Sequence, residues 1–64
     1  MILGQKVFTV NAKTNSIDSW EYAGEMFAKT ERLIHLVNGK KQCVLPARCV
    51  FDSEEKARAV ANDI

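Results

Sequence analysis

The stretch Leu33–Phe51, LIHLVNGKKQCVLPARCVF, decides the fold because it holds a turn signal between two apolar runs. Asn38 and Gly39 accept the positive φ angles of a tight type I′ turn, whose twist suits two antiparallel strands. With these two residues as the loop, Ile34 lies opposite Cys43 in the neighbouring strand. The sequence therefore predicts a β-hairpin here.

The two faces of this hairpin differ in polarity, because directly opposed residues share a face of the sheet. We expect the core face to carry four side chains: Ile34, Leu36, Cys43 and Leu45. The other face is mixed and carries Leu33, His35, Val37, Gln42 and Val44. A register slip of one residue would exchange the two faces.

The end of the hairpin carries a proline, which has no amide hydrogen for a central strand ladder. Pro46 should therefore end the strand, with Pro46–Arg48 as one tight turn and Cys49–Phe51 as a short return strand. A strand, then Leu-Pro-Ala-Arg, then a short strand resembles the end of SH3-like barrels, where a 3₁₀ turn joins the last two strands. The resemblance implies a small antiparallel barrel.

This resemblance is architectural and carries no peptide-binding activity with it. The aromatic and acidic residues with which SH3 domains bind proline-rich peptides do not stand near the start of this sequence. The opening GQKVFTV (4–10) and the later VFDSEEKA (50–57) are also similar to small proteins of phages and Gram-positive bacteria. That family supplies no known activity.

The segment before the hairpin also has strand character. Lys6–Val10 alternates, with Val7 and Thr9 facing one way and Phe8 and Val10 the other, and 11–16 has the composition of a loop. In 17–30, IDSWEYAGEMFAKT, alternate residues from Trp20 to Ala28 are mostly apolar.

Gly24, in the middle of this segment, predicts a bulge that brings Phe27 to the side of Trp20 and Tyr22. The alternative is a helix, since Trp20, Ala23, Gly24 and Phe27 have helical spacing. Trp20, Tyr22 and Gly24 are not strong helix formers, so the strand is favoured.

The C-terminal segment predicts a helix at about 53–63. Asp52 is the expected N-cap, with Glu55 completing a capping box. The apolar stripe consists of Ala57, Val60, Ala61 and Ile64. The predicted fold is one domain, 1–64, mainly β: an SH3-like small antiparallel barrel of four to five strands capped by this helix.

Composition and charge exclude several classes of protein. The 64 residues are 47% hydrophobic with a net charge of +1, which argues against disorder and against a generally basic nucleic-acid-binding surface. No apolar run reaches the length of a membrane span, and the N-terminus does not have the pattern of a signal peptide. We expect a cytoplasmic protein, bacterial or from a phage-infected host.

The sequence contains three soft metal ligands, His35, Cys43 and Cys49. The predicted register places His35 and Cys43 on opposite faces, and Cys-x5-Cys is not a zinc-binding spacing. In a cytoplasmic protein, both cysteines are expected to be reduced thiols. We predict no metal, no cofactor and no catalytic residue, because no nucleophile stands at a meaningful spacing from a base.

Two sets of residues are candidates for binding. The aromatic set, which could contact another protein or a second copy, is Trp20, Tyr22 and Phe27. The basic set, which could follow a phosphate backbone, is Lys29, Arg32, Lys40, Lys41 and Arg48. The aromatic residues are also needed for a core, and lysines at a turn also protect edge strands. The prediction is a non-enzymatic protein-interaction module; the alternative is a small nucleic-acid-binding barrel that uses the basic hairpin.

Overall fold

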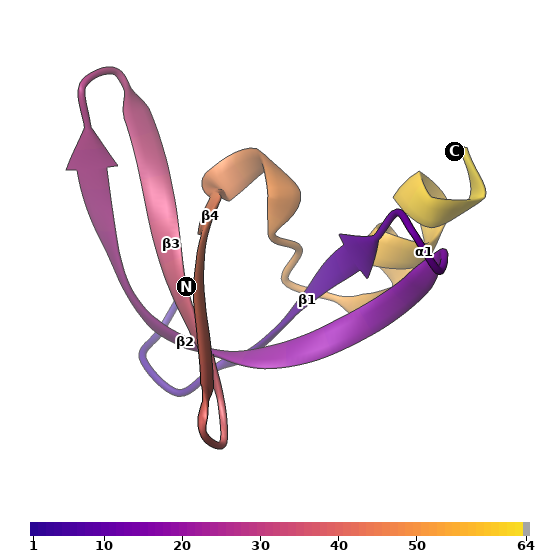
Figure 1. Ribbon diagram of the computed structural model, residues 1–64, viewed down its shortest axis with the longest axis horizontal. Helices are drawn as coiled ribbons and strands as arrows, with labels where there is room; N and C mark the ends of the chain where they lie inside the picture. Colours follow the sequence, from indigo (N-terminus) through magenta and orange to yellow (C-terminus); the bar gives the residue numbers. More distant parts are fainter. Residues whose placement is uncertain (64) are drawn as a thin grey trace.

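The computed structural model describes residues 1–63, which form one antiparallel sheet and one helix (Figure 1). The sheet has the order β1-β2-β3-β4, so each strand pairs with the next along the chain. The strands are β1 (Lys6–Asn11), β2 (Ser16–Ala28), β3 (Glu31–Asn38) and β4 (Lys41–Pro46); a 3₁₀ turn (Ala47–Cys49) and helix α1 (Glu54–Asn62) follow. The predicted class, mainly β with a C-terminal helix, is confirmed.

The sheet is open, since no ladder joins β4 to β1 within residues 1–63. Pro46 ends β4 opposite Leu33, as predicted. The turn that follows is a 3₁₀ turn over Ala47–Cys49, one residue later than predicted, so Cys49 belongs to the turn and not to a return strand. The predicted return strand is reduced to a single bridge to β1. In this bridge the amide of Phe8 donates to the carbonyl of Phe51 at 2.8 Å, and the amide of Phe51 donates back at 2.8 Å.

The loop of the β3–β4 hairpin lies one residue later than predicted. Asn38 pairs with Lys41, so Gly39 and Lys40 form the loop. Gly39 has φ 60°, and Lys40 has no positive φ, which is the pattern of a type II′ turn rather than type I′. Because the side chain of Gly39 is a single hydrogen, this positive φ angle causes little steric strain.

This displacement leaves the two faces of the hairpin unchanged. Moving a two-residue loop by one position moves every partner by two, so Ile34 lies opposite Leu45 instead of Cys43 on the same face. Ile34 and Leu36 are fully buried, and Cys43 and Leu45 pack against them. The predicted core face is confirmed although the predicted pairs are wrong.

Strand β2 is continuous from Ser16 to Ala28, which settles the choice between strand and helix. Its register with β3 shifts between Tyr22 and Glu25, and Gly24 has φ 128°, so the predicted bulge is confirmed. Tyr22 pairs with Leu36, and after the bulge Phe27 pairs with Arg32. Phe27 therefore lies on the core side of the sheet with Tyr22, as predicted.

The distal part of this strand pair extends beyond the rest of the sheet. Strand β1 pairs with β2 only up to Glu21, and β4 ends opposite Leu33. The residues 25–28 of β2 and 31–32 of β3 consequently form a two-stranded projection, which we call the β2–β3 arm. Figure 1 shows it at the upper left, away from the helix.

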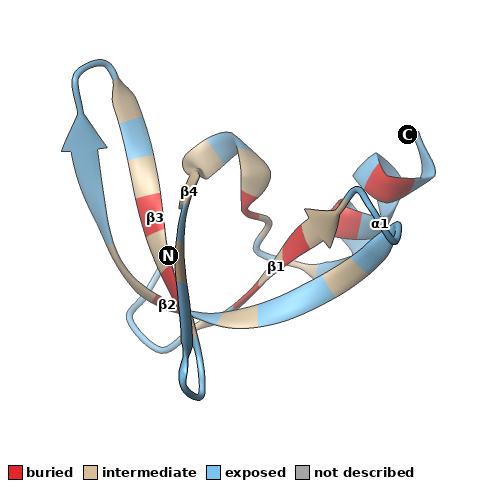
Figure 2. Ribbon diagram, in the orientation of Figure 1, coloured by how far each residue is buried: buried red, intermediate tan, exposed pale blue. Residues whose placement is uncertain are grey.

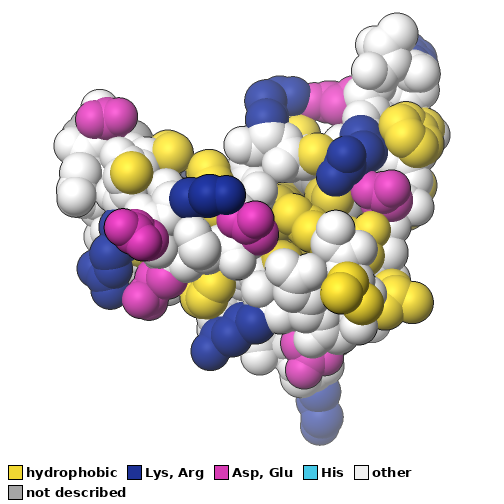
Figure 3. Space-filling model, turned by 180° about the vertical axis from the view of Figure 1, so that it is seen from behind, with side chains coloured by type: hydrophobic (Ala, Val, Ile, Leu, Met, Phe, Trp, Pro, Cys, Tyr) yellow, Lys and Arg dark blue, Asp and Glu magenta, His cyan; other side chains and the backbone are white. Residues whose placement is uncertain are grey.

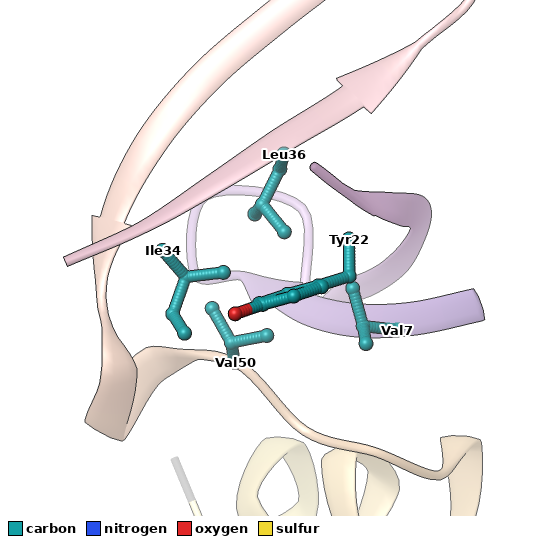
Figure 4. Close-up of a cluster of buried hydrophobic side chains, with 5 residues drawn as sticks. All are labelled: Val7, Tyr22, Ile34, Leu36 and Val50. Carbon is teal, nitrogen blue, oxygen red and sulfur yellow. The ribbon is translucent and has the colours of Figure 1, made fainter. Parts of the chain in front are cut away.

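The core is small and draws on three strands and the segment after the 3₁₀ turn. Its buried side chains, shown in Figure 4, are Val7, Tyr22, Ile34, Leu36 and Val50. The Tyr22 ring lies among the aliphatic side chains of the other four (Figure 4). Trp20, Cys43, Leu45 and Ala47 pack around this cluster. Val7 and Thr9 provide the inner face of β1, since both are buried.

Helix α1 confirms the predicted element but not its predicted cap. The N-cap is Ser53, whose hydroxyl oxygen accepts from the amide of Lys56 at 3.2 Å, so Asp52 and Glu55 form no capping box. Ala57 and Ala61 are buried where the helix packs on β1 and β2.

The predicted apolar stripe of this helix is only partly confirmed. Val60 is 40% exposed, so it lies at the rim of the helix interface rather than in it. Ile64, the last member of the stripe, lies outside the described residues.

Candidate interaction surface: the β2–β3 arm

The three aromatic candidates occupy three different environments. Tyr22 is buried at 8% exposure and belongs to the core. Trp20 is half-buried, and its indole Nε1 donates to the hydroxyl oxygen of Thr9 at 3.0 Å. Phe27 is 74% exposed, so among these three it has the surface available for a partner.

The exposure of Phe27 follows from its place on the arm. The bulge at Gly24 puts the Phe27 ring on the core side of the sheet. The cluster of core side chains that buries Tyr22, however, does not extend this far along β2. On the opposite face of the arm, Met26 pairs with Leu33 and is 49% exposed. Figure 2 shows the end of the arm as exposed, whereas buried residues lie farther along β3. Both faces of the arm thus present apolar side chains to solvent.

Charges on and near the arm are largely paired. The Arg32 Nε lies 2.8 Å from the Glu25 Oε2, and Arg48 forms a second ion pair with Glu31. With Lys29 at its tip, residues 25–32 carry two acidic and two basic side chains, for a net charge of zero. Exposed ion pairs add little stability, but they remove net charge from the surface around Phe27.

The structure separates the five residues of the basic set into two groups. Lys29, Arg32 and Arg48 lie at the arm end of β3, and Lys40 and Lys41 lie at the opposite end. The eight residues of β3 place these ends roughly 23 Å apart. Two cations of the first group are in ion pairs, so the basic set forms no continuous stripe.

Two shallow hollows adjoin Asn38, whose side-chain amide donates to the carbonyl of Ser19 at 3.1 Å. One has a volume of about 320 Å³, and its wall includes Lys6, Trp20 and Val37. The other has a volume of about 420 Å³ and is lined by Asn11, Ile17, Asp18, Ser19, Trp20, Asn38 and Lys41. Both are partly open to solvent and have a mainly polar lining, unlike the enclosed apolar clefts that hold small molecules.

The two cysteines and the histidine do not belong to the β2–β3 arm. Cys43 and Cys49 are free, half-buried thiols, and burial, together with the negative charge of Asp18, raises the pKa of Cys43. The His35 Nε2 lies 3.4 Å from the Gln42 Oε1. In residues 1–63 no three His, Cys, Asp or Glu side chains are grouped so that they could hold a metal ion.

A second exposed apolar segment, which the sequence analysis did not single out, lies at the N-terminus. Ile2 is 75% and Leu3 is 71% exposed, and the amide of Gly4 donates to the carbonyl of Tyr22 at 2.8 Å. The sequence feature that could have indicated this exposed segment is the apolar run MIL, which a glycine follows. Figure 3, which views the molecule from behind relative to Figure 1, shows hydrophobic side chains among charged ones.

Comparisons with protein-family models, with curated proteins and with solved structures find no match to this chain. None of the described helices has the length and apolar character needed to cross a membrane.

Proposed function

We propose that this chain is a non-enzymatic protein-interaction module whose contact element is the β2–β3 arm. The observation that carries the proposal is the 74% exposure of Phe27 on a projecting pair of strands. Aromatic residues and methionine are enriched at the centres of protein interfaces, and charged residues are depleted there. The arm offers Phe27 and Met26 as exposed residues of the enriched types, and the charges beside them are partly neutralised by the ion pair of Arg32 with Glu25.

Energetic considerations support the same element. Full burial of a Phe or Met side chain contributes about 1.5–3 kcal/mol relative to exposure in water. In a chain of 64 residues, whose main cluster of buried side chains has five members among residues 1–63, leaving Phe27 and Met26 outside forgoes a large part of the available stabilisation. A partner that covers the arm would recover it on binding.

We also propose that the chain is related in architecture to SH3-like barrels. The bridge between Phe8 and Phe51 supports this proposal, because it adds the segment after the 3₁₀ turn to the outer edge of β1. The long β2, which pairs with β1 in its first half and with β3 in its second, gives further support.

Nucleic-acid binding through the basic set has weaker support. Lys40 and Lys41 at the tip of the β3–β4 hairpin are exposed, but the remaining three cations lie at the other end of β3. Affinity for a phosphate backbone grows with the number of cations that contact it together. Binding of this kind would weaken steeply with salt and would fail in the Lys40→Glu/Lys41→Glu double variant.

The test is capture of a partner from a lysate of the source cells by the tagged chain, with and without nuclease. We expect Phe27→Ser/Met26→Ser to lose a captured protein that the parent chain retains after nuclease treatment. Val60→Ser, which changes another exposed apolar residue on the helix, is the matched control and should retain it. Equal capture by both variants, or capture abolished by nuclease, would contradict the proposal; circular dichroism checks that each variant is folded.

A further inference from the structure

The outer edge of β2 is free along the arm. On this side the last backbone contacts are those of Tyr22, whose amide donates to Gln5 at 2.9 Å and whose carbonyl accepts from Gly4 at 2.8 Å. The amide of Gln5 in turn donates to the carbonyl of Ile2 at 2.9 Å, which closes a turn at the N-terminus. In the described part of the chain, residues 24–28 have no backbone partner on this edge.

The register of the arm shows which backbone groups face outward. Ala28 and Glu31 flank the two-residue loop, so they form the hydrogen-bonded closing pair of the hairpin. Hydrogen-bonded and non-hydrogen-bonded pairs alternate along antiparallel strands. Phe27 and Glu25 therefore direct their amides and carbonyls away from β3, toward solvent.

Lysine and proline do not occur on this edge, in contrast to the edge of β4. Edge strands avoid unwanted pairing by carrying lysine, proline or a β-bulge, and the only one of these on the arm is the bulge at Gly24, at its base. Strand β4 begins with Lys41 and ends with Pro46, whereas residues 24–28 read Gly-Glu-Met-Phe-Ala and include neither residue type. The arm edge is consequently the one suited to strand addition.

The edge is complementary to itself. In an antiparallel pairing of two copies about a two-fold axis at Met26, Glu25 lies opposite Phe27 of the partner subunit, and the reverse. Both residues direct their backbone groups outward, so this register forms four hydrogen bonds between the chains. A pairing centred on Glu25 instead opposes two carboxylates, which is unfavourable. In a pairing centred on Phe27, Phe27 is the only strand residue whose outward-facing backbone groups form hydrogen bonds between the chains.

Side chains support the same register. Met26 meets the partner subunit's Met26, and each is flanked by Leu33 of its own chain, which gives one apolar row across four strands. The net charge of residues 25–32 is zero, so two arms approach without net repulsion. On the other face of the ribbon, Phe27 lies beside the partner subunit's Glu25.

We propose that a second copy of this chain occupies the arm edge, forming a two-fold dimer through β2 centred on Met26. The proposal rests on the proposed function and names its partner. The arm is small, so the contact buries much less than the roughly 1,600 Å² of a standard interface. The dimer is therefore weak: the chain is monomeric at micromolar concentration and dimeric near millimolar concentration.

The first test compares proline substitutions on the two free edges. Sedimentation equilibrium across this concentration range should show association of the parent chain, and Phe27→Pro should abolish it by removing an outward amide. Val44→Pro makes the same change at an exposed residue of β4 and should leave association intact. Loss of association in Val44→Pro but not in Phe27→Pro would overturn the proposal by placing the contact on the other edge.

The second test uses cross-linking and does not depend on a proline variant that folds. In a Cys43→Ala/Cys49→Ala background, Met26→Cys places two thiols on opposed residues with Cα atoms about 4.5 Å apart, within reach of a disulfide. Ala28→Cys places them roughly 13 Å apart along the strands. In a glutathione redox buffer Met26→Cys should form the disulfide-linked dimer and Ala28→Cys should not; equal cross-linking at both positions would overturn the register.

The outcomes separate this inference from the proposed function. A parent chain that stays monomeric at every concentration, with lysate capture that still depends on Phe27, overturns the dimer and leaves the interaction module. Neither association nor capture that depends on Phe27 overturns both.

Discussion

Replacing Lys29 by glycine should stabilise the protein by about 1 kcal/mol. Strand β3 is flanked by two two-residue loops, and the first residue of each has nearly the same backbone angle: φ is 58° at Lys29 and 60° at Gly39. Only Gly39 is a glycine, the residue type that adopts this positive φ angle without strain.

The magnitude follows from two opposing terms. A side chain held at positive φ costs of order 1–3 kcal/mol, and glycine loses about 0.5–1 kcal/mol more backbone freedom than alanine on folding. The difference favours glycine at Lys29. The reverse substitution, Gly39→Ala, should cost about 1 kcal/mol. A Cβ at Gly39 meets no atom within 4 Å, so that loss reports the backbone angle and not a clash.

Thermal and urea unfolding measure both effects. For a domain of this size, 1 kcal/mol corresponds to a shift in Tm of about 4–8 °C. Lys29→Ala is the control, because it removes the charge and keeps the Cβ, and it should give no comparable gain. The reasoning would be refuted if Lys29→Gly were no more stable than Lys29→Ala.

Two further predictions concern the helix cap and the half-buried thiol of Cys43. Ser53→Ala removes the acceptor for the Lys56 amide and should lower the free energy of unfolding by about 1 kcal/mol, whereas Asp52→Ala should cost less; equal losses in urea unfolding would argue against Ser53 as the cap. In a Cys49→Ser background, Cys43 should react with iodoacetamide more slowly than a free thiol at pH 8, because a raised pKa leaves less thiolate. Asp18→Asn should speed the reaction only partly, since burial is the larger cause; a midpoint of the pH–rate profile at or below the ordinary value would contradict this.

Local patterns in the sequence were sufficient for the four strands, for the C-terminal helix and for the faces of the β3–β4 hairpin, but not for the predicted return strand. Alternating apolar residues predicted the strands, Gly24 predicted the bulge, and Pro46 predicted the end of β4, because each depends on the backbone preferences of a few neighbouring residues. The core face of the β3–β4 hairpin was also predictable, since it depends on the parity of the register. The position of the loop was not, because Asn38-Gly39 and Gly39-Lys40 satisfy the same parity.

Exposure was decided by the tertiary structure. Trp20, Tyr22 and Phe27 lie on one side of one strand, and nothing in their local sequence distinguishes a core ring from a surface ring. Their environments differ because β1 and β4 end before the arm begins, so the layer that buries Tyr22 does not reach Phe27. The basic residues separate for the same kind of reason: β3 places residues near in sequence at opposite ends of a rigid strand. The sequence by itself therefore determined what each segment becomes, and the lengths of the neighbouring strands determined which side chains remain free to bind.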